Sequence, residues 1–389
     1  MGWCGAGTVL LLIVLVFVFW PRRARADEAP YADMINALGT EDGFPVRGRI
    51  VREAEPVDIH QASPLGESSQ DELRDVVVTL RCGEVALGTC TADVEGYLDA
   101  CVVPLKGAIG PGAHVVQVVL GDAVIGRFSL RVLPRNFDGL VVRSDIDKTY
   151  LDTAFTRKRD IAALLVAPGP KRAALPGMEV VYHGLRAGAD GKDNRPLVFL
   201  SGSPRFFKRT LESKMERDGV VQDGVLLKPF KEIASRRAWD FAPRDIVPSL
   251  KEQIGYKLLW LLRARLELPP GARELLLGDD SEADHVVYAL YHRLLAGELD
   301  AVALDAELSR LGVGESWRGK IAPVVPKVVA QTGGKSPVAG IYINRTGESH
   351  GPHAAEQWVV VGLTRLHQGS WPLALDLMEE GWLSRRSVD

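Results

Sequence analysis

Short apolar runs that end in polar residues recur from residue 139 onward, and they constrain the fold of the chain most strongly. They lie at 139–144, 197–200, 275–277 and 339–343, with helical patterns between them. A strand buried on both faces reads as a continuous apolar run, and strands that alternate with helices form a parallel sheet with helices on both sides. The sequence therefore predicts an α/β domain over residues 137–348.

Two acids follow the first apolar run. Asp145 and Asp147 are two residues apart, and Thr149 comes two residues later. Side chains at i and i+2 of a strand leave on the same face, and α/β sheets bind ligands at the carboxyl ends of their strands. One carboxylate could attack phosphorus while the other moves protons, beside a hard cation. Solvated loops and turns also carry acid pairs at this spacing, which is the alternative interpretation.

Polar residues after the second run and in a later helix fit the same chemistry, because phosphoryl transfer needs hydrogen-bond donors and a positive side chain. Residues 201–204 (Ser-Gly-Ser-Pro) suit an anion-binding corner, and equally an ordinary strand-to-helix turn with a serine N-cap. Lys257 lies in the helical pattern 249–262, where it either faces water or contacts a phosphate as a point charge. Neither pattern decides between its alternatives alone.

An acidic cluster follows the third run. Residues 278–284 read Gly-Asp-Asp-Ser-Glu-Ala-Asp and contain four acids in seven positions. So many carboxylates repel one another unless a cation lies among them, although acids also favour the first turn of a helix. The acidic cluster at residues 278–284 is therefore a predicted metal-binding site.

The order of these motifs resembles that of the haloacid dehalogenase-like phosphohydrolases, and most closely the App1-type phosphatidate phosphatases. The family core S-D-I-D-D-T resembles residues 144–149, and the serine motif S-x-S-P matches residues 201–204. The late motif G-D-S-x-x-x-D resembles residues 278–284, and the last core strand A-I-Y-I is similar to residues 339–343. The likeness covers about residues 43–344 and is most specific at the acidic and serine motifs.

The resemblance implies a haloacid dehalogenase-like Rossmannoid domain and a phosphatase that works through an aspartyl-phosphate. It implies Asp145 as the nucleophile and Asp147 as the general acid and base. It implies Ser201 for binding the phosphoryl oxygens and Lys257 for stabilising the phosphoaspartate. Thr149 and Ser203 are further candidate substrate-binding residues, and the sequence leaves open whether Ser201 or Ser203 donates to the phosphate. The implied substrate is phosphatidate, a lipid phosphate.

The same resemblance implies a magnesium ion as cofactor. Asp145 and Asp279 would ligate it through their side chains, and Asp147 through its main-chain carbonyl. Asp280 or Asp284 would support the ion, either directly or through the other ligands.

Four features depart from the family pattern. Lys148 replaces the usual second Asp of D-D-T, and Arg205 comes where the family has an aromatic residue after the serine motif. Tyr256 replaces the common His before the motif lysine, and residues 298–338 resemble an insertion before the last strand. These departures bear on the substrate more than on the reaction.

The first residues of the chain predict membrane targeting. Residues 1–20 carry no charged side chain, and three arginines follow within residues 22–25. The A-x-A pattern at 24–26 fits a signal peptide cleaved after Ala26 and export to a periplasmic or extracytoplasmic space. Positive charges after the apolar run fit instead a retained anchor over residues 1–20, with the rest of the chain in the cytoplasm. Residues 1–26 are therefore predicted as a signal peptide or an N-terminal membrane anchor.

Residues 27–136 predict an all-β domain. Segments 76–82 and 115–119 are rich in β-branched residues, segment 128–132 alternates, and turn signals lie at short spacing between them. This pattern predicts a small immunoglobulin-like sandwich with a packing or spacer role.

Three cysteines fall in the β-domain: Cys82, Cys90 and Cys101. Export permits one disulfide and one free thiol among them, and three half-buried thiols are the alternative. At the other end of the chain, residues 349–389 predict a C-terminal strand and an amphipathic helix.

The overall charge of the chain argues against nucleic acid as a binding partner. A net charge of −3 and a pI near 6.3 provide no global attraction to nucleic acid. From the motifs and the family resemblance, the chain is expected to be a Mg²⁺-dependent phosphatase of phosphatidate, acting at a membrane surface. Two alternatives are a phosphatase of a soluble phosphomonoester and a catalytically silent, membrane-associated binding protein.

Overall fold

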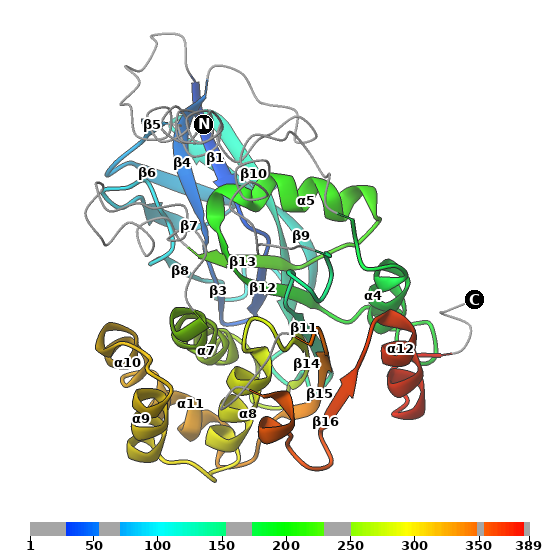
Figure 1. The fold of residues 1–389 in the computed structure, drawn as a ribbon. Coiled ribbons are helices and arrows are strands. Elements are labelled where there is room, and N and C mark those ends of the chain that lie inside the picture. Colours follow the sequence, from blue (N-terminus) through cyan, green and yellow to red (C-terminus); the bar gives the residue numbers. More distant parts are fainter. Residues whose placement is uncertain (1–28, 54–70, 153–172, 229–249, 348–353, 385–389) are drawn as a thin grey trace, which may run out of the picture.

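The computed structural model describes residues 29–53, 71–152, 173–228, 250–347 and 354–384. A mostly-β region comes first in the chain, and a six-stranded parallel sheet with helices follows it (Figure 1). The predicted targeting segment 1–26 lies outside the described residues. Within the described ranges, no helix is both long enough and apolar enough to cross a membrane.

The β region contains a seven-stranded sheet and a three-stranded sheet. The larger sheet has the order β7-β6-β9-β10-β2-β3-β8. Its strands are β2 (Ala37–Thr40), β3 (Gly43–Pro45), β6 (Val77–Cys82), β7 (Val85–Thr91), β8 (Val102–Pro104), β9 (Gly112–Leu120) and β10 (Ala123–Leu133). The smaller sheet consists of β1 (Ala29–Met34), β4 (Gly48–Glu53) and β5 (Asp71–Glu72).

The predicted all-β character is confirmed, but the sheet is a near-barrel and not an immunoglobulin-like sandwich of two facing sheets. Its edge strands β7 and β8 are in contact, so the sheet curls almost onto itself. The long strand β10 pairs with β9 on one side and, in parallel, with β2 on the other. A bulge between Val124 and Gly126 interrupts its pairing with β9, and bulges increase strand twist. These pairings join strands from both ends of the region into one sheet.

A disulfide lies in the β region. It joins Cys90 of β7 to Cys101, whose Cα atom is 5.8 Å away, and Cys82 is a free thiol. Of the two predicted alternatives, the structure therefore has one disulfide and one thiol. Cys90 is part of the core, which contains Phe44, Val116 and Phe128.

The parallel sheet confirms the predicted α/β class. Its order is β13-β12-β11-β14-β15-β16, and all neighbours are parallel. The strands are β11 (Leu140–Ser144), β12 (Leu197–Pro204), β13 (Gly224–Lys228), β14 (Arg273–Asp279), β15 (Val338–Asn344) and β16 (Thr364–His367). The four predicted apolar runs are β11, β12, β14 and β15, the four central strands.

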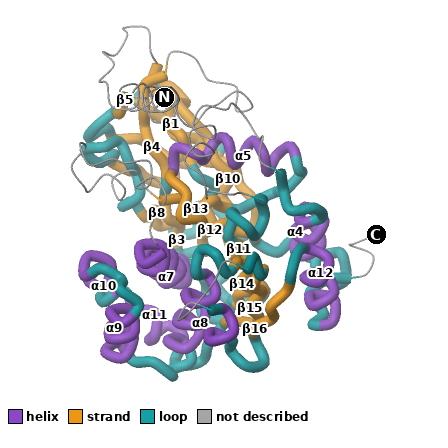
Figure 2. The backbone as a smooth tube through the Cα atoms, in the orientation of Figure 1, coloured by secondary structure: helices purple, strands orange, loops and turns teal. Residues whose placement is uncertain are grey.

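Helices cover both faces of this sheet, as Figure 2 shows. On one face, α7 (Leu250–Leu266) and α8 (Asp284–Leu295) contact the strands, and α9 (Ala301–Arg310), α10 (Glu315–Ile321) and α11 (Val325–Thr332) pack against these two helices. The other face packs against α4 (Met178–Ala187), α5 (Lys208–Arg217) and α12 (Ser370–Glu379). Two short 3₁₀ helices, η1 (Arg205–Phe207) and η5 (Ala355–Trp358), complete the described elements.

Two stretches singled out in the sequence have regular structure. The stretch 298–338 contains α9, α10 and α11, which join the apolar core beneath the sheet. The C-terminal stretch supplies β16 and α12, and β16 pairs with β15, so this stretch extends the same parallel sheet.

Candidate active site

The candidate site lies where the central strands of the parallel sheet end. Asp145 directly follows β11, and its backbone N–H donates to Leu277 O in the neighbouring strand β14 over 2.9 Å. Asp279 is the last residue of β14, and Asp284 is the first residue of α8. Lys257 comes from the middle of α7. Residues far apart in the chain therefore meet at one edge of the sheet.

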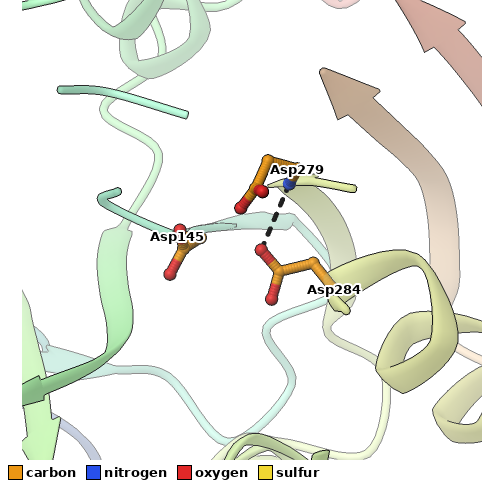
Figure 3. A group of neighbouring side chains, drawn as sticks. All are labelled: Asp145, Asp279 and Asp284. Carbon is orange, nitrogen blue, oxygen red and sulfur yellow. Dashed lines mark hydrogen bonds between the residues drawn. The ribbon is translucent and has the colours of Figure 1, made fainter. Parts of the chain in front are cut away.

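Three buried carboxylates face one another in this site (Figure 3). Asp145, Asp279 and Asp284 each offer an oxygen, and these atoms lie within 4.8 Å of one another. The Asp279 N–H donates to Asp284 Oδ2 over 3.2 Å, which holds the start of α8 against the end of β14. Gly278 makes this approach possible, because an added Cβ would lie 2.5 Å from the Asp284 Cβ.

Lys257 faces these acids and not water. Its ammonium donates to Asp145 Oδ1 over 2.9 Å, to Asp284 Oδ1 over 2.6 Å and to Glu282 Oε2 over 3.1 Å. Burial by itself lowers the pKa of Lys257, but the carboxylates, Asp145 and Asp284 foremost, raise it well above its ordinary value. Lys257 is therefore a fixed positive charge inside the acidic cluster.

One ammonium does not neutralise the cluster. Burial raises the pKa of Asp145 well above its ordinary value, Lys257 opposes this shift, and Asp284 adds to it. Burial and the carboxylates of Asp284 and Glu282 likewise raise the pKa of Asp279. The pKa of Glu282 rises to about 7, chiefly through burial. Further positive charge would therefore be bound favourably here.

The available oxygen atoms fit a hard divalent cation. Asp145 Oδ2 and Asp279 Oδ2 are buried and have no hydrogen-bond partner among the described residues. Lys257 contacts the other oxygen of Asp145, Oδ1, so Oδ2 is left for a second positive group. Carboxylate oxygens are preferred ligands of Mg²⁺. Asp145, Asp279 and Asp284 could therefore hold a metal ion.

Asp147 lies in a different environment from Asp145. Its Oδ2 accepts hydrogen bonds from Ser203 Oγ over 2.9 Å and from Ser201 Oγ over 3.3 Å. The Ser203 N–H also donates to Ser201 Oγ over 3.0 Å. Both predicted serines therefore meet the second predicted acid, and the motif is not merely a turn between a strand and a helix.

Two of the predicted residues lie apart from these contacts. Asp280 Oδ1 accepts from the Thr346 N–H over 2.7 Å and from Thr346 Oγ1 over 2.5 Å, so this carboxylate contacts the loop after β15. Of the two predicted supporting acids, Asp284 and not Asp280 lies in the acidic cluster. The hydroxyl of Thr149 is buried without a hydrogen-bond partner within the described ranges.

Sequence patterns missed two residues that shape the site. Glu282 contacts Lys257, and its place among the acids of 278–284 was the available signal. Asn344 ends β15, its Nδ2 donates to Lys148 O over 2.7 Å, and its Oδ1 accepts from the Gly369 N–H. Its position at the end of an apolar run could have identified it, as it identified the acids.

Lys148 is a departure from the family core. The hydrogen bond described for its side chain does not reach the acidic cluster. Its ammonium donates to Asp152 over 3.0 Å, and its backbone has φ 60°. Asp and Asn adopt this left-handed conformation more readily than Lys. The Lys148 carbonyl is nevertheless held by Asn344, which fixes the loop after Asp147.

Comparison with known proteins identifies the domain that carries this site. Residues 140–304 match the family model described as phosphatidate phosphatase APP1, catalytic domain. The match begins at the first residue of β11 and spans both acidic motifs, the serine motif and Lys257. A search of curated proteins gives no significant match. The resemblance inferred from the motifs is thus confirmed, and residues 140–304 are a catalytic domain of the phosphatidate phosphatase APP1 family, a phosphoric monoester hydrolase.

Proposed function

We propose that this protein is a Mg²⁺-dependent phosphatase of the haloacid dehalogenase-like type that hydrolyses phosphatidate or a related lipid phosphate. The observation that carries the proposal is the position of Asp145, buried at the end of β11 between Lys257 and two further carboxylates. The order of strands and motifs and the family of residues 140–304 support it.

Asp145 is the nucleophile. Lys257 holds its Oδ1, so the carboxylate has a fixed direction at the end of the strand. A carboxylate oxygen of Asp145 forms a bond to phosphorus while the bond from phosphorus to the leaving alcohol oxygen breaks. Lys257 then stabilises the negative charge of the phosphoaspartate.

Asp147 moves the protons of both half-reactions. It first donates a proton to the leaving alcohol oxygen, and as a carboxylate it then accepts a proton from water. That water attacks the phosphoaspartate, which releases inorganic phosphate and regenerates the Asp145 carboxylate. The hydroxyls of Ser201 and Ser203, which contact Asp147, are close enough to the same site to donate to phosphoryl oxygens when substrate is bound.

Asp145 and Asp279 would hold Mg²⁺ through their Oδ2 atoms, with Asp284 beside them. The ion supplies positive charge that offsets the repulsion between the phosphate and the carboxylates. The chain's own contribution is to present these oxygens in a buried, rigid arrangement, because Lys257 and the Asp279 N–H already fix Asp284.

The lipid substrate rests on the family and on the predicted targeting segment. Phosphatidate is the substrate in the description of the matched family. A signal peptide or anchor in residues 1–26 would bring the enzyme to or across a membrane, which is where such a substrate lies. We accordingly propose a targeting segment at 1–26, a β-domain at 27–136, a catalytic domain at 137–348 and a C-terminal extension at 349–389.

The test is phosphate release from two substrates, phosphatidate in mixed micelles and para-nitrophenyl phosphate. Each is measured with and without Mg²⁺ for the wild type, for Asp145→Asn and for Asp305→Asn. Asp305 is a matched control because it is about half exposed and pairs with Arg318 on the helical side of the domain. We expect release that requires Mg²⁺, is lost in Asp145→Asn and persists in Asp305→Asn.

The outcomes separate the alternatives. Release from phosphatidate that vanishes in Asp145→Asn supports both the mechanism and the lipid substrate. Release from para-nitrophenyl phosphate alone retains the mechanism and replaces the lipid with a soluble phosphomonoester. No release from either substrate by folded wild-type protein that binds Mg²⁺ favours a catalytically silent binding protein.

A further inference from the structure

The segment that follows the serine motif carries three buried cationic side chains. Arg205, Lys208 and Arg209 are only 6, 4 and 5% exposed. Arg and Lys are rarely so buried unless they are paired. Their segment, η1 and the start of α5, lies beside the β region in Figure 1. Their partners therefore identify what holds this segment in place.

Arg205 is held by the β region through one hydrogen bond and a second ion-pair contact to the same carboxylate. Its Nη1 donates to Asp99 Oδ1 over 2.9 Å, and its Nη2 lies 2.8 Å from Asp99 Oδ2. The guanidinium also lies over the ring of Tyr97, 5.0 Å from its centroid. Asp99 is itself fixed, because its Oδ1 accepts from the Gly48 N–H over 3.2 Å. A two-point Arg–carboxylate contact restrains orientation as well as position.

A second contact lies one helical turn further on. The Lys208 ammonium donates to Asp33 Oδ1 of β1 over 2.8 Å and to Glu212 Oε2 over 2.8 Å. Arg209 Nε lies 3.8 Å from Asp33 Oδ1, and its guanidinium lies over the ring of Tyr31. Burial would raise the pKa of Asp33, but Lys208 and Arg209 bring it below its ordinary value. Asp33 is therefore a charged partner for both cations.

The serine motif itself has little support from the sheet. Along β12 and β13, Ser201 pairs with Leu227 and Pro204 pairs with Lys228, so Gly202 and Ser203 lie between two consecutive pairings. A bulge of this kind redirects side chains but leaves the extra residues outside the ladder. Pro204 and Arg205 are thus the first firmly held residues after the hydroxyls that contact Asp147.

We propose that Asp99 and Asp33 of the β region are positioning residues for the serine motif. By holding Arg205, Lys208 and Arg209, they keep Ser203 directed at the site of Asp147. The β region then takes part in catalysis as a support and is more than a spacer. The part of this inference that concerns rate rests on the proposed phosphatase function, whereas the part that concerns the position of the loop does not.

An ion pair elsewhere between the same two regions makes a matched control. Arg47 of the β region pairs with Glu267, just after α7. Glu267 belongs to the connection between the end of α7 and the start of β14. It therefore lies at the amino ends of the strands, whereas the candidate active site lies at their carboxyl ends. Asp99→Asn and Glu267→Gln therefore each weaken an Arg–carboxylate contact between the regions, but only Asp99→Asn affects the serine motif.

The experiment uses the full chain in detergent micelles and two measurements. Hydrogen exchange of the peptide covering residues 197–207 reports the Ser203 amide, which donates to Ser201 Oγ. Steady-state kinetics with para-nitrophenyl phosphate and Mg²⁺ report kcat and KM. In Asp99→Asn we expect faster exchange at Ser203 and a kcat lower by about ten-fold, with a smaller change in KM, because misplaced catalytic groups slow the chemical step. Glu267→Gln should match the wild type in both measurements.

Each outcome decides the inference. Wild-type exchange at Ser203 in Asp99→Asn, or equal losses in Asp99→Asn and Glu267→Gln, would overturn it. If Asp99→Asn does not fold, Asp33→Asn is measured in the same way and decides by the same criteria. If wild-type protein releases no phosphate while Asp99→Asn still exposes Ser203 to exchange, the positioning role stands and the proposed phosphatase function fails.

Discussion

At the scale of single residues, two acids from one motif have different partners. Asp145 lies against Lys257 and two carboxylates, while Asp147 accepts hydrogen bonds from Ser201 and Ser203. Environments that differ in this way allow two carboxylates of the same type to serve as nucleophile and as acid–base group. The i and i+2 spacing brings both to one site, and their neighbours separate their roles.

The acidic cluster predicts how Mg²⁺ changes stability. Burial and neighbouring acids raise the pKa of Asp279, so its charged form destabilises the metal-free fold at neutral pH. We expect Asp279→Asn to melt at the wild-type temperature or above it without metal. A hundred-fold excess of Mg²⁺ over its Kd should stabilise the wild type by about 3 kcal/mol, and Asp279→Asn should lose that gain.

Thermal unfolding with and without Mg²⁺ measures both effects. Asp280→Asn is the matched control, because Asp280 contacts Thr346 outside the cluster and Asn can keep that contact. Equal Mg²⁺-dependent shifts in Asp279→Asn and the wild type would exclude Asp279 as a ligand.

His367, at the end of β16, predicts a dependence of stability on pH. Burial lowers its pKa to about 4 from an ordinary 6.5, although a hydrogen bond with Gly369 O opposes the shift. Between these values the unfolded chain binds a proton that the folded chain does not, so the free energy of unfolding falls as pH falls from 6.5 to 4. The full loss is about 3 kcal/mol, at 1.36 kcal/mol per pKa unit.

Urea unfolding between pH 4.5 and 7 measures this dependence. His367→Gln should flatten it, and the exposed His183→Gln should leave it as in the wild type. A wild-type slope in His367→Gln would mean that other groups cause the loss.

At the scale of elements, the site depends on close contact between the end of β14 and the start of α8. The Asp279 N–H donates to Asp284 Oδ2, and Gly278 leaves room for the Asp284 side chain. The last two residues of β14 therefore determine where Asp284, the first residue of α8, directs its carboxylate. The bulge in β12 has a comparable effect on Ser203, since it takes that residue out of the ladder.

Gly278→Ala tests the contact between β14 and α8. The new Cβ would lie 2.5 Å from the Asp284 Cβ and 2.7 Å from its Oδ2, so Asp284 must move away from Lys257. We expect weaker Mg²⁺ binding by at least about ten-fold and a loss of stability of about 1–3 kcal/mol from overpacking. Isothermal titration with Mg²⁺ and chemical unfolding measure these changes.

Gly202→Ala is the comparison, since the three described atoms nearest to its Cβ would belong to the Gln253 side chain, at 3.5 Å or more, which is ordinary van der Waals contact. It should fold and bind Mg²⁺ as the wild type does. Similar losses in both variants would show that any added methyl group near the site is disruptive, whatever it contacts.

At the scale of the whole molecule, a near-barrel and a parallel sheet meet through buried charges. Asp223 accepts from Arg131 of β10 over 2.7 Å and from Arg186 of α4 over 2.6 Å. The ion pair between Arg131 and Asp223 joins the two regions at one place. The contacts of Asp33 and Asp99 join them at others. We therefore expect them to unfold in one transition.

The disulfide offers a test of stability at this scale. It closes a loop with a sequence separation of 11 between Cys90 and Cys101. We expect its reduction to lower the free energy of unfolding by about 3 kcal/mol, because the unfolded chain regains the freedom of that loop. Protein that begins at residue 27 should show one thiol before reduction, that of Cys82. The size of the reduction effect should not change in Cys82→Ser.

The sequence allowed much of the fold and site to be predicted, but not the contacts between regions. The burial of Arg205 was not predictable, because its partner Asp99 lies more than a hundred residues earlier, in a loop of another sheet. The near-barrel was not predictable either. Alternating strands fit sandwiches and barrels alike, and the contact between the edge strands β7 and β8 decides between them.

The sequence by itself determined the parallel sheet and the acids at its edge, because continuous apolar runs that end in polar residues match strands buried on both faces. Only the tertiary structure decided that Lys257 faces the acids, and that Asp284 joins Asp145 and Asp279 while Asp280 contacts Thr346. The direction of a side chain at the start of a helix depends on how the helix packs against the strand before it. That packing is a property of residues far apart in the chain.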